Sequence, residues 1–88
     1  MSVKDIRELF SQSGMVAEEV YIDEDENIAN VYIEVSSILI YTIDGIEEIV
    51  KKVKDIRSTL VEKGIIDDVT FGDLYQGTWR ILIHFDAE

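Results

Sequence analysis

The hydrophobic residues change their spacing several times along the chain, and each change predicts a new element. The first spacing is helical, with apolar residues at Val3, Ile6, Leu9 and Phe10. Ser2 can cap such a helix, with Asp5 at its third position, and Gly14 can end it. The predicted helix is short, so it must be held by packing rather than by intrinsic propensity.

The spacing then becomes two, which is typical of half-buried strands. Residues 17–23 predict a strand with Val20 and Ile22 facing inward, and residues 23–27 predict the loop of a hairpin. The return strand begins near Ile28. Its expected core residues are Ala29, Val31, Ile33 and Val35.

The run 38–43 is apolar at every position and has two interpretations. It is either a third strand buried on both faces or a continuation of the preceding strand past a bulge at Ser36 and Ser37. The bulged strand is favoured, because neither serine suits the positive φ of a two-residue hairpin loop.

The clearest helical pattern covers residues 44–63 and predicts the helix that forms the core. Thr42 or Asp44 can cap this helix, and Gly64 can end it. Its apolar stripe consists of Ile46, Ile49, Val50, Val53, Ile56, Leu60 and Val61.

Two further strands are expected after this helix. The first covers about 65–74, with Val69 and Phe71 on one face, and a turn at 75–77 leads to the second, 78–86. This last strand has the most regular alternation, with Trp79, Ile81, Ile83 and Phe85 on one face.

The element order α-β-β(-β)-α-β-β, with strands joined mostly by local hairpins, predicts an α+β fold. We expect a mostly antiparallel sheet of four to five strands, with the long helix packed on one face. At 88 residues the chain has room for one hydrophobic core. Residues 1–88 are therefore predicted to form a single domain.

The chain has 19 acids, 8 bases and a net charge of −11, and this bears on its partners. Such a charge repels nucleic acids and anionic lipid surfaces, so neither is an expected ligand. There is no cysteine, no apolar signal core and no long apolar run, which together fit a cytoplasmic protein outside the membrane. A protein with a basic surface is the natural partner.

The acids concentrate between Glu8 and Val50, where eleven acids occur without any Lys, Arg or His. Asp44, Glu47 and Glu48 have a structural explanation, because carboxylates are favoured at the positive end of a helix. The acids of the predicted hairpin have no such explanation. They are the expected partner-binding residues: Glu18, Glu19, Asp23, Glu24, Asp25, Glu26 and Glu34.

The hairpin also carries an incomplete calcium-loop pattern. Asp23, Asp25, Asn27 and Glu34 occupy four of the ligand positions of such a loop. Ile28 stands where the loop needs a glycine, and the flanking segments predict strands instead of helices. We therefore predict no dedicated metal site.

No combination of nucleophile, base and orienting group is evident in the sequence. His84 is the single histidine, and it falls on the side of the last strand opposite the core. Acids are too abundant for any pair of them to indicate catalysis. The chain is therefore expected to be non-enzymatic and to use no cofactor.

Several apolar residues fall on the sheet face away from the predicted core. One helix layer cannot cover both faces of a sheet, so Tyr32, Tyr41 and Leu82 form a candidate interface. The first helix, a second copy of the chain in a homodimer, or a target protein could cover this face.

Two functions are consistent with these features. The first is an acidic inhibitor or adaptor that docks on the basic groove of a nucleic-acid-binding protein, because a groove that neutralises phosphates accepts a row of carboxylates. In size and charge the chain resembles phage-encoded anti-CRISPR and anti-restriction proteins that imitate DNA, a likeness of composition and not of motif. The alternative is a small homo-oligomeric structural or regulatory domain in which the acid serves solubility.

Overall fold

The computed structural model describes residues 2–34, 42–63, 66–75 and 78–85, and these ranges contain two helices and four strands. In chain order the elements are α1 (Val3–Gln12), β1 (Ala17–Asp23), β2 (Ile28–Glu34), α2 (Ile43–Glu62), β3 (Ile66–Tyr75) and β4 (Thr78–Phe85). The order α-β-β-α-β-β confirms the predicted α+β fold with one long helix.

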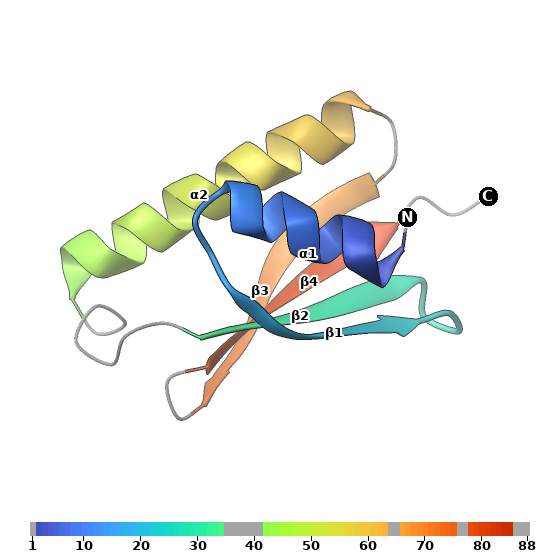
Figure 1. Ribbon diagram of the computed structural model, residues 1–88, viewed down its shortest axis with the longest axis horizontal. Helices are drawn as coiled ribbons and strands as arrows, with labels where there is room; N and C mark the ends of the chain where they lie inside the picture. Colours follow the sequence, from blue (N-terminus) through green and yellow to red (C-terminus); the bar gives the residue numbers. More distant parts are fainter. Residues whose placement is uncertain (1, 35–41, 64–65, 76–77, 86–88) are drawn as a thin grey trace.

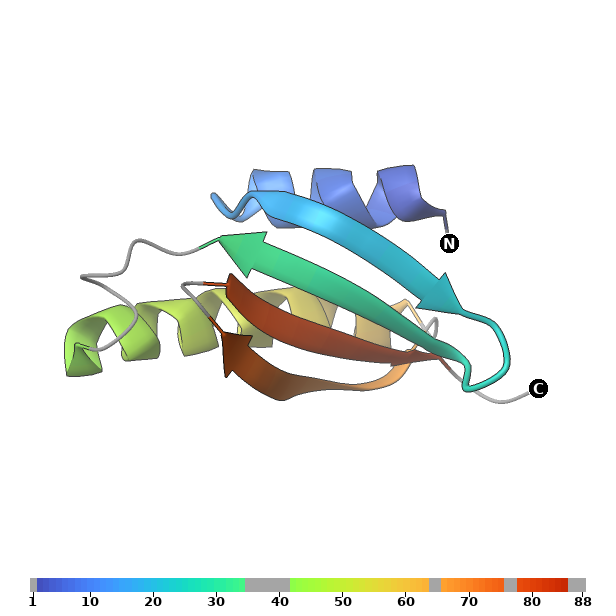
Figure 2. The same cartoon turned by 90° about the horizontal axis from the view of Figure 1, so that it is seen from below.

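The four strands form one antiparallel sheet in the order β1-β2-β4-β3 (Figure 1). β2 and β4 occupy the centre, and β1 and β3 form the edges. Seen from below, the strands lie in front of α2, and α1 lies on that same far side of the sheet (Figure 2). The first helix therefore does not cover the second face of the sheet, which leaves a second copy of the chain or a target protein as its possible partner.

The core lies between the sheet and both helices. From α1, Ile6 and Phe10 are fully buried. From α2, the buried side chains are Ile49, Val53, Ile56 and Leu60. The central strands contribute Ala29, Val31, Ile33, Ile81 and Ile83. These residues confirm the central part of each apolar face that the spacing predicts, and each large one stabilises the fold by about 1.5–3 kcal/mol. The predicted stripes are too wide at their margins, because Val3, Ile46 and Val61 are exposed.

A bulge interrupts β1 near its start. Ala17 pairs with Ile33 and Glu19 pairs with Tyr32, so Glu18 is an extra residue on this strand. Ala17 lies three residues before Val20, so in a regular strand the two side chains would point to opposite faces. The bulge turns Ala17 to the same face as Val20, and Ala17 is buried. Val20 and Ile22 pack against the core, as their spacing predicts.

Both helices begin at the predicted caps. The Ser2 hydroxyl accepts a hydrogen bond from Asp5 N, and the Asp5 carboxylate accepts one from Ser2 N. This reciprocal bond lowers the pKa of Asp5. The Thr42 hydroxyl accepts from Gly45 N at 3.0 Å. α1 ends before Gly14, whose φ of +80° is a conformation that glycine adopts without strain.

The run 38–43 is only partly covered by the structure. Ile43 is the first residue of α2, so the run does not extend as a strand to its last residue. The question of a third strand or a bulged continuation falls on 35–41, outside the described residues, as do Val35 and Tyr41.

The end of the β3–β4 hairpin is less buried than its alternation suggests. Phe71 pairs with Ile81 on the core side of the sheet, as predicted, but remains exposed. Its ring lies 4.8 Å from that of Trp79, centroid to centroid. A register shift between Phe71 and Leu74 then alters the pairing. The hairpin therefore ends in an aromatic pair at the margin of the core.

Candidate functional site

The second face of the sheet carries the candidate interface and is not covered by α1 or α2 (Figure 2). We call this surface the open face. Tyr32 pairs with Arg80, and the neighbouring pair is Asn30 with Leu82. Tyr32 and Leu82 are half-buried, and Tyr21 on the edge strand is 58% exposed. The structure thus brings Tyr32 and Leu82 to one surface, as the sequence predicts.

Arg80 lies at the centre of the open face and is already neutralised. Its guanidinium forms an ion pair with Asp73, and its Nη1 donates to Asn30 Oδ1 at 3.5 Å. The contact with Asp73, and to a smaller degree Tyr32, raises the pKa of Arg80. Gly72 leaves room for this side chain, because a Cβ there would lie 2.9 Å from Arg80 Nε. The base therefore adds no free positive charge to this face.

Glu18 and Glu34 bring two carboxyl groups into contact at one end of the β1–β2 hairpin. The bulge places Glu18 near Glu34, the last residue of β2. A hydrogen bond to Glu34, and then the charge of Glu34, raise the pKa of Glu18 above its ordinary value of 4.5. The two carboxyls thus repel each other when both are ionised, and a cation placed between them would relieve that repulsion.

Arg7 holds the bulge against α1. Its guanidinium donates to the backbone carbonyls of Ala17 and Glu18, the second at 3.2 Å. These bonds give hydrogen-bond partners to two carbonyl groups at the bulge of the edge strand β1. Arg7 therefore fixes the backbone beneath Glu18, while the Glu18 and Glu34 carboxylates form no ion pair within the described residues.

The other end of the hairpin is an ordered acidic loop. The Asp23 carboxylate accepts hydrogen bonds from Asp25 N at 3.0 Å and Glu26 N at 3.1 Å. Asn27 has a φ of 59°, and its Nδ2 donates to the Phe85 carbonyl at 3.1 Å. Asp23 thus has a structural role in closing the turn, in addition to the partner-binding role predicted for it.

The seven predicted acids therefore form two groups, not one row. Glu24, Asp25 and Glu26 are exposed at the loop, and Glu18 and Glu34 lie at the opposite end of the strands. Five residues of strand separate the two ends, a distance of about 17 Å. Glu19 lies on the open face beside Tyr32. In the described parts of the chain, none of the seven takes part in an ion pair.

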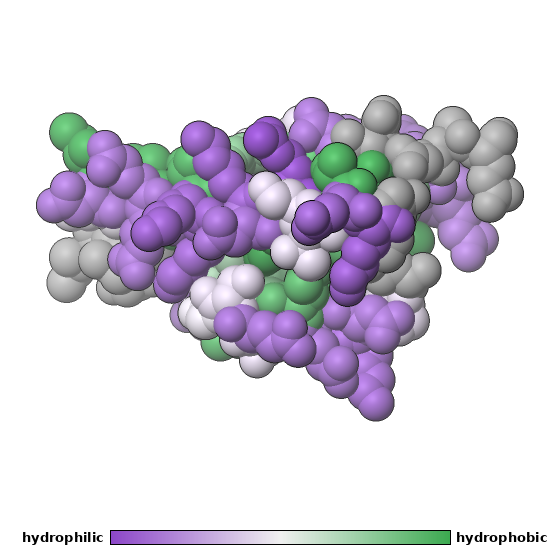
Figure 3. Space-filling view, turned by 90° about the horizontal axis from the view of Figure 1, so that it is seen from above, coloured by the Kyte–Doolittle hydropathy of each residue, from purple (hydrophilic) through white to green (hydrophobic). Residues whose placement is uncertain are grey.

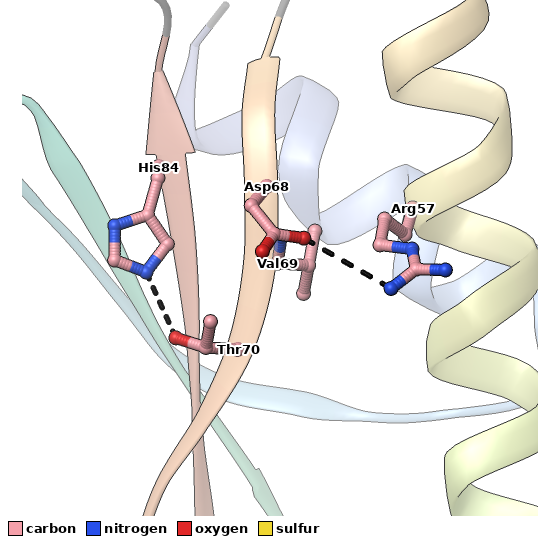
Figure 4. A network of polar contacts seen from close by, with 5 residues as sticks. All are labelled: Arg57, Asp68, Val69, Thr70 and His84. Atoms are coloured by element: carbon pink, nitrogen blue, oxygen red, sulfur yellow. Dashed lines mark hydrogen bonds and ion pairs between the residues drawn. The ribbon is translucent and has the colours of Figure 1, made fainter.

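His84 has a hydrogen-bond partner on the open face. Its Nε2 lies 2.8 Å from the Thr70 hydroxyl, while Asp68 points the other way, toward Arg57 of α2 (Figure 4). No carboxylate among the described residues bonds to the imidazole. Within the same ranges, no group of three or more His, Asp or Glu residues could hold a metal ion, including the incomplete calcium loop.

The comparisons with known proteins give no family. Neither family models, nor curated proteins, nor solved structures match this chain. In the described part of the chain, neither helix combines the length and the apolar content needed to cross a membrane.

Proposed function

We propose that this chain is a non-enzymatic, acidic protein-binding module that docks its β1–β2 hairpin and open face on a basic groove of a nucleic-acid-binding protein. In this role it would act as an inhibitor of the DNA-mimic kind, with anti-CRISPR and anti-restriction proteins as the functional analogues. The groove normally neutralises phosphates with Lys and Arg, and carboxylates of the module occupy the same positions.

The contact between Glu18 and Glu34 is the observation that carries this proposal. Two carboxyl groups are held together on an ordered bulge, and no base of the described residues forms an ion pair with either. Two ionised carboxylates in this arrangement repel each other in the free protein. A Lys or Arg of the partner converts this repulsion into attraction, so the free protein is prepared for a cationic ligand.

The order of the hairpin loop adds to the argument. The bonds of Asp23 to the backbone and of Asn27 to Phe85 hold the loop in one conformation. Glu24, Asp25 and Glu26 are therefore presented without a large entropic cost on binding. The two acidic ends, about 17 Å apart along the strands, can contact separate basic residues across one groove.

The alternative function, a homo-oligomeric structural or regulatory domain, is less well supported by the open face. Two copies that met through Tyr32 and Leu82 would also bring together Glu19 and Glu34 of both chains, which lie on the same face. Like charges in an interface oppose association. The open face therefore suits a basic partner better than a second copy.

A capture experiment from nuclease-containing cell lysate tests the proposal. The immobilised chain should retain a nucleic-acid-binding protein at about 0.1 M salt, release it at about 0.5 M, and lose it to added duplex DNA. A variant with Glu18→Gln and Glu34→Gln should capture much less of it.

The matched control carries Glu8→Gln and Glu62→Gln, which remove the same charge from α1 and α2. This control should capture as well as the unmodified chain. Equal losses in both variants would show that net charge alone governs capture. Retention that is unchanged at high salt would contradict docking through the acids.

A further inference from the structure

α2 presents a second apolar surface that does not face the core. Ile43 is 76% exposed and Ile46 is 36% exposed, while Val50 is half-buried. Ile46 and Val50 line a shallow groove together with the charged residues Glu47, Lys51 and Lys54. We call these six residues the α2 flank. From above, apolar atoms gather along one border of α2 near its start (Figure 3).

The position of the α2 flank follows from helical geometry. Each residue turns the helix by about 100°, so Ile43, Ile46 and Val50 lie about 90° around the axis from the buried stripe. Arg57 shares this side of the helix and reaches Asp68 of β3 at 4.0 Å (Figure 4). The α2 flank therefore points outward past the edge strand β3, roughly in the plane of the sheet.

The charge on this part of the chain differs from that of the rest. Residues 43–63 hold five acids and five bases, so the net charge of −11 lies entirely outside them. Two copies of an acidic protein repel each other over most of their surfaces. The segment around α2 carries no net charge, so it adds little to that repulsion.

The charges of the α2 flank are also arranged in a self-complementary order. Glu47 precedes Lys51 and Lys54 along the helix, and none of the three is in an ion pair within the described residues. An antiparallel copy of the same helix reverses this order. Glu47 of one copy then faces a lysine of the other at one end of the contact. Two-fold symmetry repeats the same pair at the other end.

We propose that a second copy of this chain packs on the α2 flank, with the two α2 helices antiparallel about a two-fold axis near Val50. The Val50 side chains then approach each other across the axis. Glu47 of each copy lies opposite Lys54 of the other, and Ile43 and Ile46 cover the aliphatic part of the lysine side chains. The flank of one helix is smaller than a standard interface, so the dimer is reversible, with Kd about 10–100 µM.

Sedimentation across a concentration series, from about 5 µM to about 1 mM, tests the proposal around the expected Kd. The unmodified chain should change from monomer to dimer within this range. Ile46→Glu should raise Kd at least tenfold, because it buries a charge without a partner. Val16→Glu is the matched control, since Val16 is 69% exposed and follows Gly14, which lies near Lys52 on the side of α2 away from the α2 flank. It should leave Kd unchanged, and circular dichroism should show all variants folded.

Charge exchange tests the antiparallel arrangement. Glu47→Lys and Lys54→Glu should each weaken self-association about tenfold, because each replaces two attractive contacts per dimer with two repulsive ones. A mixture of the two variants should form a one-to-one dimer, and the variant with both changes should dimerise like the unmodified chain.

Three results would overturn the proposal: a monomer at about 1 mM, an Ile46→Glu variant that dimerises normally, or exchange variants that fail to recover when mixed.

Discussion

At the scale of single residues, the bulge in β1 determines the electrostatics of the candidate site. In a regular strand Ala17 and Val20 would point to opposite faces, because side chains alternate. The extra residue allows both to face the core and places Glu18 beside Glu34. The unfavourable contact between carboxyl groups is thus a consequence of how the backbone satisfies the core.

Removing one of these carboxyl groups should change how stability depends on pH. Because Glu34 raises the pKa of Glu18, the folded state binds that proton more tightly than the unfolded state. The associated stability is present below the ordinary value of 4.5 and is lost as pH rises through the raised pKa. Glu34→Gln should therefore be more stable than the unmodified chain at pH 7, by urea denaturation, with the difference vanishing below about pH 4.

A titration of Glu18 by NMR provides the control for this prediction. In Glu34→Gln the pKa of Glu18 should fall toward its ordinary value. A variant that is equally stabilised at acidic and neutral pH would show that another interaction is responsible.

At the scale of elements, the caps were visible in the sequence and the arrangement of the helices was not. Ser2, Thr42 and Gly14 act through neighbours three or four residues away, so local sequence identifies them. The placement of α1 on the same face as α2 depends on contacts between distant residues. No periodicity within α1 specifies which face of the sheet it covers.

The cap of α2 offers a test at this scale. Thr42→Ala removes the acceptor for Gly45 N and should lower the free energy of unfolding by about 1 kcal/mol. Ser58→Ala, at an exposed position within the same helix, should cause no loss, because alanine has the higher helix propensity. Urea denaturation of both variants measures the difference, and equal losses would exclude a capping effect.

The candidate site was predicted in part, and the missing part has a physical reason. The seven acids were identified because no base lies near them in the sequence. The contact between Glu18 and Glu34 was missed because it depends on the bulge and the register of β1 on β2, which the alternation of residues does not specify. The role of Asp23 was missed because a carboxylate that closes a turn and one that binds a partner look alike in sequence.

At the scale of the whole molecule, the net charge of −11 is concentrated on a small fold. Self-repulsion of this kind destabilises a compact state, and salt screens it. Raising NaCl from about 0.02 to about 0.2 M should therefore increase the free energy of unfolding by about 1 kcal/mol, or Tm by about 4–8 °C.

The control for this prediction is a variant in which Glu24, Asp25 and Glu26 are replaced by Ser. Its net charge is closer to zero, so salt should stabilise it less than the unmodified chain in the same thermal scan. Equal salt responses would place the repulsion elsewhere in the molecule.

The direction of the α2 flank has a consequence for docking. Because the flank lies roughly in the plane of the sheet, an antiparallel pair of α2 helices places its two-fold axis along the sheet normal. Both open faces then point to the same side, and the dimer becomes a bivalent ligand. Once one face is bound, the second meets its site at a high effective concentration. A symmetric target would thus be held through avidity, even if each single contact were weak.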